Sequence, residues 1–256
     1  MPLNSLQRRL PRSIRNGIRR RQDEKTLATL LRVQCDSSKL AQSLPTLGMQ
    51  PFRPHAIGEN SGAVNPGDQR AIYALAKATG AKVVLEIGTH VGGSTLIWAR
   101  ALPDDGHLTT VDILDVNGPE GACARLSLPS PLQQLEQEGL AGKVTFMAQD
   151  SIKFLRNCRE KFDLIFLDGL HDAVQVYQEI PLALARLSAG GIVILHDVFP
   201  QLKPLWPDRE VIPGPWLALE RFRREGAKFK VHPLGTLPWV TKQGTNVTSL
   251  ALLIGA

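Results

Sequence analysis

The sequence predicts an α/β protein in which a mostly parallel, seven-stranded sheet carries helices on both faces. Strand-like and helix-like segments alternate from about residue 60 onward, as they do in parallel sheets with crossover helices. The run FDLIFLD at 162–168 is apolar almost without a break, which is typical of a strand covered on both sides. We expect residues 61–256 to form this domain and residues 1–60 to form a basic N-terminal arm and helical cap.

The first predicted helix of the domain is bounded by residues with clear capping chemistry. Asn65 is suited to cap its N-terminus, Pro66 fits the first helical position, and Gly80 fits the stop. Apolar residues recur at helical spacing over 174–187, where Pro181 is expected to kink or split the helix. The other predicted helices follow Ser94 and cover 131–139, 151–158 and 216–225. The predicted strands are 82–87, 107–113, 143–148, 162–168, 191–197, 228–234 and 248–255.

Two loops stand out by composition. Residues 115–131 are rich in glycine and proline, and residues 199–215 are rich in proline and hold Trp206. The second loop is expected to fold over a binding cleft, because it is too broken for a helix and too structured in composition for a linker. Beyond it, strands 228–234 and 248–255 are expected to pair at the edge of the sheet.

The net charge of +6 is concentrated at the N-terminus. Residues 1–32 hold nine basic side chains against Asp23 and Glu24, a balance of +7. The rest of the chain is therefore close to neutral, which argues against nucleic acid as a partner of the domain. For the arm, four interpretations stay open: a solvated helix, contact with a membrane surface or lipid-linked substrate, RNA binding, or a transit peptide.

The composition favours a soluble protein of the reducing cytoplasm. With 43% hydrophobic and 21% charged residues the chain can bury one sizeable core, and no apolar run approaches the roughly 18 residues that a membrane span needs. The N-terminus lacks the apolar region of a secretory signal. Three scattered cysteines indicate neither a disulfide framework nor a zinc site; they are Cys35, Cys123 and Cys158.

The stretch LEIGTHVGGST contains the glycine turn on which the cofactor prediction depends. Gly88, Gly92 and Gly93 do not fit the G-x-G-x-x-G spacing that a dinucleotide pyrophosphate requires. Glu86, at the end of the strand, is a poor neighbour for a pyrophosphate and a good one for a cationic ligand. The pattern resembles the first motif of the class I S-adenosylmethionine (SAM)-dependent methyltransferases, in which an acidic residue precedes G-x-x-x-G. The resemblance implies a Rossmann-like fold and SAM as cofactor.

Further residues at the same edge of the sheet extend this predicted site. Asp112 ends the second strand 26 residues after Glu86, where a carboxylate can accept both ribose hydroxyls. Asp150 follows the third strand, where the resemblance implies contact with the adenine. The resemblance also implies that Ser94 meets the amino-acid end of SAM beside residues 62–69, and His90 is expected to line the pocket without a chemical role. The predicted cofactor-binding residues are Glu86, Gly88, Thr89, His90, Gly92, Ser94, Asp112, Asp150, Ser151 and Asp168.

The motifs FLDGLHD and ILHDVF end the fourth and fifth strands, so their polar side chains are expected to face one cleft. The group comprises Asp168, His171, His196 and Asp197. Two carboxylates with imidazole suit a divalent cation, and nitrogen ligands are tolerated better by Mn, Fe, Co or Zn than by Mg. His171 also suits a general base, since its ordinary pKa is about 6.5.

These two motifs resemble those of the metal-dependent O-methyltransferases of the catechol and macrolide-sugar types, which are grouped with cephalosporin-hydroxylase-like proteins. In the catechol enzymes a catalytic Lys lies three positions after a metal-binding Asp; here His171 stands there, as in the sugar enzymes. Those families then bind the metal with Asp-Asn or Glu-Asp, whereas this chain has His196, Asp197 and Val198. The resemblance implies that Asp168, His196 and Asp197 bind Mg²⁺, or Mn, Fe, Co or Zn given His196, and that His171 is the catalytic base.

Taken together, the sequence predicts a metal-assisted, SAM-dependent O-methyltransferase that acts on a hydroxyl of a small-molecule or sugar-containing metabolite. The alternatives are a SAM-binding or metal-dependent oxidative protein of the same fold, a nucleic-acid methyltransferase that uses the basic arm, and a nicotinamide dehydrogenase, against which the glycine spacing argues. Homodimerisation through the N-terminal helices is compatible with the sequence, but no pattern requires it. Aromatic candidates for the wall of the acceptor site are Phe199, Trp206, Trp216 and Trp239.

Overall fold

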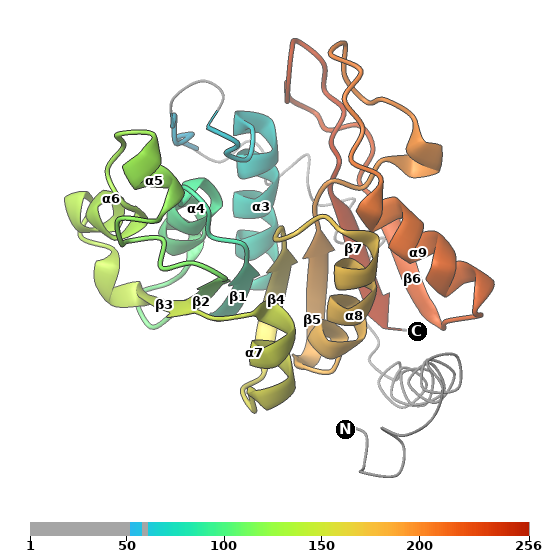
Figure 1. Cartoon of the computed structure of the whole chain (residues 1–256), viewed down its shortest axis with the longest axis horizontal. Helices are drawn as coiled ribbons and strands as arrows, with labels where there is room; N and C mark the ends of the chain where they lie inside the picture. Colours follow the sequence, from blue (N-terminus) through green and yellow to red (C-terminus); the bar gives the residue numbers. More distant parts are fainter. Residues whose placement is uncertain (1–51, 58–60, 256) are drawn as a thin grey trace.

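The computed structural model describes residues 52–57 and 61–255, and its centre is a seven-stranded sheet of order β3-β2-β1-β4-β5-β7-β6 (Figure 1). The first five strands in this order are parallel, and β7 runs antiparallel to both of its neighbours. The predicted fold class is therefore confirmed. The strands are β1 (Val83–Ile87), β2 (His107–Asp112), β3 (Val144–Ala148), β4 (Phe162–Leu167), β5 (Leu187–Leu195), β6 (Phe229–Pro233) and β7 (Ala251–Gly255).

Helices cover both faces of the sheet because its central strands are apolar on both sides (Figure 1). On β4, Ile165 and Leu167 belong to the core beneath one face, and Leu164 and Phe166 to the core beneath the other. The first core is covered by α7 (Ser151–Asn157), α8 (Ala173–Leu184) and α9 (Gly214–Arg224), and the second by α3 (Pro66–Thr79) and α4 (Gly93–Ala101).

The helix ends follow the capping chemistry read from the sequence. Asn65 accepts a hydrogen bond from the Asp68 backbone N–H at 3.0 Å, and Gly80 closes α3 with φ 63°. Ser130 forms a reciprocal capping box with Gln133 at the start of α6 (Pro131–Gln137). The predicted caps at Asn65 and Gly80 and the predicted helix start at residue 131 are confirmed, and the Ser130 cap is a further feature that the structure shows.

Some boundaries differ from the sequence-based expectation. The loop predicted over 115–131 contains the four-residue helix α5 (Ala122–Arg125), and short 3-10 turns occur at Ala141–Lys143 and Pro200–Leu202. Pro181 does not split α8, because it lies in the last turn and the helix ends only at Leu184. β5 starts at Leu187, four residues early, and its pairing with β4 is irregular between Phe162 and Leu164.

The C-terminal strands pair as predicted, and β7 inserts between β5 and β6. The connection between them returns to the start of α3, where the Trp239 indole N–H donates to the Gly67 carbonyl at 2.9 Å. A Cβ on Gly67 would lie 2.4 Å from the Thr241 Cα, so a glycine is needed for this approach. The C-terminal segment therefore holds the start of α3 against the sheet.

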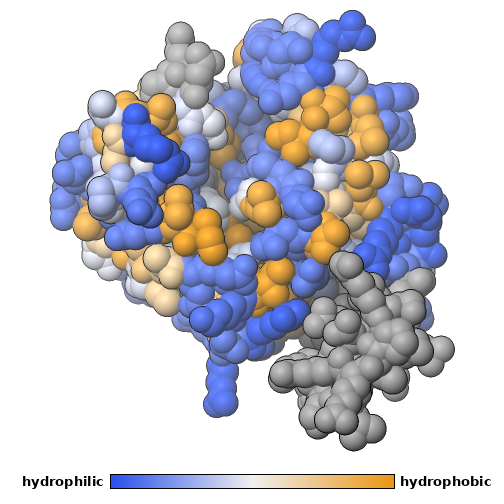
Figure 2. Space-filling model, viewed as in Figure 1, coloured by the Kyte–Doolittle hydropathy of each residue, from blue (hydrophilic) through white to orange (hydrophobic). Residues whose placement is uncertain are grey.

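Most of the predicted N-terminal arm, including all its basic clusters up to residue 51, lies outside the described residues. The described piece at 52–57 packs on the domain: His55 lies 2.7 Å from the Gln134 side chain, and its backbone N–H donates to Gln69 at 2.8 Å. Among the residues that the structure describes, no helix has the length and apolar content needed to cross a membrane. On the face seen in Figure 2, hydrophobic side chains form separate patches among hydrophilic ones.

Candidate active site

One cleft of about 740 Å³ lies at the carboxyl ends of the parallel strands, which is where open α/β sheets bind ligands. Segments following β1, β2, β3, β4 and β5 all contribute to its walls, as does 62–65 before α3. Two predicted site residues, Glu86 and Gly92, are absent from its lining. The predicted site residues that line it are Gly88, Thr89, His90, Ser94, Asp112, Asp150, Ser151, Asp168, His171, His196 and Asp197.

The glycine turn after β1 is shaped by its contact with the end of β4. Gly88 has φ 97°, and a Cβ there would lie 2.2 Å from the Asp168 carbonyl oxygen. Only glycine combines this backbone conformation with so close an approach. His90 also has a left-handed φ of 49°, and its Nε2 lies 2.8 Å from the Ser61 carbonyl. The turn is therefore packed directly against the residues expected to perform chemistry.

Glu86 lies under this turn and is completely buried. The hydroxyls of Thr95 and Thr110 donate to its Oε2 at 2.5 and 2.7 Å, and Oε1 has no hydrogen-bond partner among the described residues. Burial raises the pKa of Glu86 to about 7, although hydrogen bonds from Ser94, Thr95 and Thr110 act in the opposite direction. Glu86 thus supports the turn from behind, whereas the sequence predicts a direct contact with the cofactor.

Asp112 and Asp150 lie on the cleft and also organise the backbone around it. The Asp112 Oδ2 accepts hydrogen bonds from the backbone N–H groups of Thr89 at 3.2 Å and His90 at 3.0 Å, so it fixes the glycine turn. Asp150 caps α7 by accepting the Lys153 N–H at 2.8 Å. Both carboxylates keep acceptor capacity toward the cleft, since each oxygen can accept more than one hydrogen bond.

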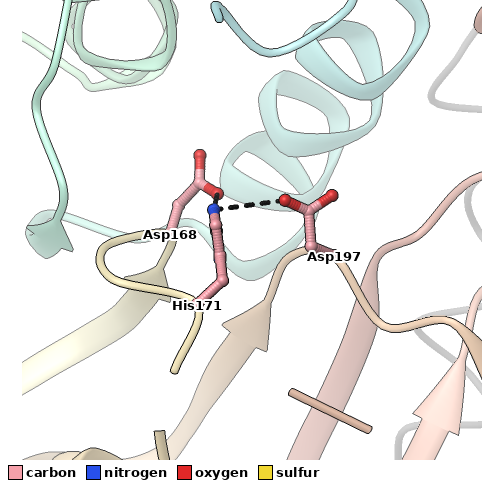
Figure 3. Close-up of side chains that lie close together, drawn as sticks. All are labelled: Asp168, His171 and Asp197. Carbon is pink, nitrogen blue, oxygen red and sulfur yellow. Dashed lines mark ion pairs between the residues drawn. The ribbon is translucent and has the colours of Figure 1, made fainter. Parts of the chain in front are cut away.

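Asp168, His171 and Asp197 lie together where β4 and β5 end (Figure 3). One ligand atom from each lies within 4.8 Å of the others. The His171 Nε2 is 3.2 Å from the Asp197 Oδ2 and 3.9 Å from the Asp168 Oδ1. Asp197 has φ 54°, a left-handed conformation of the kind found at functional sites. Two carboxylates and one imidazole at one point form a donor set suited to a divalent cation.

The loop that carries His171 is held by α9. A Cβ on Gly214, the first residue of α9, would lie 1.9 Å from the His171 carbonyl oxygen. The His171 side chain nevertheless keeps 31% of its surface exposed toward the cleft. It is therefore reachable by a ligand, while its backbone is fixed.

His196 is buried beside this cluster, and its imidazole lies close to the carboxylates of Asp68, Asp168 and Asp197. Its Nδ1 lies 2.8 Å from the Asp168 Oδ1, without hydrogen-bond alignment, and its Nε2 lies 3.4 Å from the Oδ2 of the buried Asp68. Burial lowers the pKa of His196, but the charges of Asp168 and Asp197 outweigh it and raise the pKa well above the ordinary value. Burial raises the pKa of Asp197, but His196 and His171 outweigh it and lower that pKa to about 2. His171 joins the two carboxylates as a possible ligand. The His196 Nδ1 also lies 3.5 Å from the Asp197 Oδ1, and its role as a metal ligand stays a prediction.

Sequence reasoning did not single out Asp68 as a site residue. Its place in the sequence indicates only the start of a helix. Asp68 does pair with the N-cap residue Asn65, whose side-chain amide donates to it at 2.7 Å. Its contact with His196 joins positions 128 residues apart, which no local pattern reveals.

The loop 199–215 forms one side of the cleft, as predicted. Phe199 and Trp206 line the cleft and pack edge to face with ring centroids 5.5 Å apart. Trp216 and Trp239 do not line it: Trp216 packs against the core, and Trp239 is engaged with α3. Glu210, Ile212 and Lys242 complete this side.

Comparison with known proteins finds relatives in sequence and in fold. Residues 85–198 match the family described as a methyltransferase domain. One relative is a protein of Mycobacterium sp. (strain KMS) that is provisionally named an O-methyltransferase. It is 30% identical over 144 residues, and the match covers 56% of this chain and 61% of the relative. The chain thus spans less than two thirds of the length of the curated relatives that it matches.

Solved structures show the same fold. The O-methyltransferase TomG from Streptomyces achromogenes, solved with SAM, has a TM-score of 0.54 and 23% identity, and the match covers 88% of this chain and 93% of TomG. An O-methyltransferase from Bacillus cereus, solved with S-adenosylhomocysteine (SAH), has a TM-score of 0.54 and 21% identity, covering 88% and 94%. The predicted resemblance is confirmed: residues 85–198 are similar to a methyltransferase domain, and the chain shares the fold of these structures.

Proposed function

We propose that the protein is an O-methyltransferase that transfers the methyl group of SAM to a hydroxyl of a small-molecule or sugar-containing metabolite with neighbouring hydroxyls. The observation that carries the proposal is the direct packing of the glycine turn on Asp168: a Cβ on Gly88 would lie 2.2 Å from the Asp168 carbonyl oxygen. A nucleoside held by the turn therefore lies beside the Asp168, His171 and Asp197 cluster, within one cleft.

The methyl donor fits the polar groups of the cleft. Asp112 accepts the ribose hydroxyls, and Ser94 with residues 62–65 faces the amino-acid end. SAM supplies an electrophilic sulfonium methyl group, so a weakly nucleophilic alcohol needs to lose its proton on the way to transfer. The role of the chain is to align the hydroxyl with this methyl group and to remove that proton.

The donor set beside the turn fits a divalent cation. Asp168 and Asp197 would hold it. His171 lies close to both carboxylates, so its imidazole is on the same side of the cleft. A bound cation supplies Lewis-acid chemistry, which lowers the pKa of a coordinated hydroxyl. The two carboxylates alone suit Mg, whereas an added imidazole ligand, such as the predicted His196, would favour Mn, Fe, Co or Zn.

His171 is the proposed proton acceptor. Its side chain is accessible from the cleft, and its Nε2 already lies within hydrogen-bonding distance of the Asp197 carboxylate, 3.2 Å away. Phe199 and Trp206 form an apolar wall that excludes water from the reacting groups. Because the transition state neutralises charge between alkoxide and sulfonium, a dry site favours it.

The test is a methyl-transfer assay with isotope-labelled SAM and a panel of vicinal diols, catechols and sugars, beside analogues with only one hydroxyl. We expect transfer to acceptors with neighbouring hydroxyls, loss of turnover after chelation, and restoration by a divalent cation. Asp168→Ala should abolish turnover. Full activity of that variant, or undiminished turnover after chelation, would refute the role of the cation.

A further inference from the structure

A buried carboxyl group next to the cleft has no part in the proposed methyl transfer. Glu179, on α8, keeps 2% of its surface exposed, yet it forms no ion pair with any other residue that the structure describes. The Ser151 hydroxyl donates to its Oε1 at 2.5 Å. The Gln175 side-chain amide donates to the same oxygen at 3.0 Å and to the Ser151 Oγ at 2.8 Å. Ser151 and Gln175 line the cleft, and Glu179 lies behind them.

This cluster determines which way the Gln175 amide faces. The Gln175 Nε2 points to Glu179 Oε1 and Ser151 Oγ, and the hydroxyl hydrogen of Ser151 is used toward Glu179. If the amide were rotated by half a turn, its carbonyl oxygen would face two acceptors, which is unfavourable. Within the described part of the chain, no donor bonds the Gln175 Oε1 at its position. Gln175 lines the cleft, so this oxygen remains available to accept a hydrogen bond from a ligand there.

The position of the cluster matches the base end of a bound nucleoside. The reacting end of the ligand lies at Asp168 and His171, at the β4 and β5 side of the cleft. Asp112, on β2, is the acceptor for the ribose, and β3 is the next strand outward, with Ala148 paired to Asp112. Ser151 lies three residues after the end of β3, at the start of α7. A nucleoside that extends from β4 across β1 to β2 therefore places its base beside Ser151 and Gln175.

We propose that Gln175, oriented by Glu179, accepts a hydrogen bond from the exocyclic amino group of the cofactor's purine and so selects adenine over 6-oxopurines. This inference rests on the proposed use of SAM. An oxygen at purine position 6 would face the Gln175 carbonyl oxygen, and the amide cannot turn to suit it without losing its contacts with Glu179 and Ser151. Gln175 thus discriminates between the purines by direct contact, and Glu179, which does not line the cleft, acts by holding the Gln175 amide in place.

The experiment is calorimetric titration of the full chain with SAH and with its 6-oxo counterpart, S-inosylhomocysteine. Titrations are run at pH 8, because burial raises the pKa of Glu179 to about 7, against the hydrogen bonds from Ser151 and Gln175. We expect the wild-type protein to bind SAH at least tenfold more tightly than the inosyl compound. In Gln175→Leu and in Glu179→Leu that ratio should fall to about twofold or less.

The matched control is Gln178→Leu, the same substitution on the same helix at a residue that does not line the cleft, and it should keep the wild-type ratio. If Glu179→Leu does not fold, Gln175→Leu still decides. An unchanged ratio in Gln175→Leu, with SAH bound normally by the wild type, would overturn this inference alone. Failure of the wild type to bind SAH would overturn the proposed function, and this inference with it.

Discussion

Replacing Glu86 by glutamine should change how the stability of the protein depends on pH. Burial raises the pKa of Glu86 from 4.5 to about 7 in the folded protein. Between these values the folded state keeps a proton that the unfolded chain has lost, so the free energy of unfolding falls as pH rises. At about 1.36 kcal/mol per pKa unit, the full penalty above pH 7 is about 3 kcal/mol. Glutamine is neutral throughout and avoids this penalty.

Urea unfolding followed by circular dichroism at several pH values measures this effect. The stability of Glu86→Gln relative to the wild type should rise by about 2 to 3 kcal/mol between pH 5 and pH 8. Taking the difference between the two proteins removes the contribution of Glu179, whose pKa is also raised to about 7, mainly by burial. A difference that stays constant with pH would refute the reasoning. SAH affinity should change less than about threefold, because Glu86 supports the turn without lining the cleft.

Three further substitutions test other parts of the account. Gly88→Ala should destabilise the protein by more than about 2 kcal/mol in urea unfolding and weaken SAH binding, because its Cβ would overlap the backbone at Asp168. Gly80→Ala is the control: Gly80 also has a positive φ but open space around it, so this substitution should cost only about 1 kcal/mol. His171→Ala should lower kcat by a factor of about 10² to 10⁴ without changing SAH affinity. Weaker Mn²⁺ binding in that variant, measured by electron paramagnetic resonance, would instead make His171 a ligand. Trp206→Ala should raise the acceptor KM while SAH affinity stays unchanged, and equal loss of both would contradict its placement on the acceptor side.

Local chemistry made much of the fold predictable. The caps at Asn65 and Gly80 and the unbroken apolar run of β4 each depend on neighbouring residues, and the structure has them where the sequence indicates. The strand-end carboxylates Asp112 and Asp150 line the cleft for the same reason, since the ends of parallel strands meet at one edge.

The remaining features depend on contacts between distant residues. Glu86 ends its strand as the motif requires, yet Thr95 and Thr110 enclose its carboxyl group beneath the turn. From its place in the sequence, Asp68 is expected only at the start of a helix. In the folded chain the His196 imidazole also lies beside its carboxylate. From the sequence alone, Glu179 is expected to be an ordinary glutamate of a helix. In the structure α7 and α8 together bury it behind the cleft. These contacts join residues from different segments, so no sequence pattern within one segment predicts them.

The most direct test of the central claim is calorimetric titration with SAH and, separately, NADH, of the wild type, Asp112→Ala, and the surface control Asp104→Ala. The wild type and the control should bind SAH and not NADH. Asp112→Ala should bind SAH at least tenfold more weakly, because Asp112 both fixes the glycine turn and faces the ribose. Preference for NADH, or unchanged SAH affinity in Asp112→Ala, would contradict the placement of SAM in this cleft.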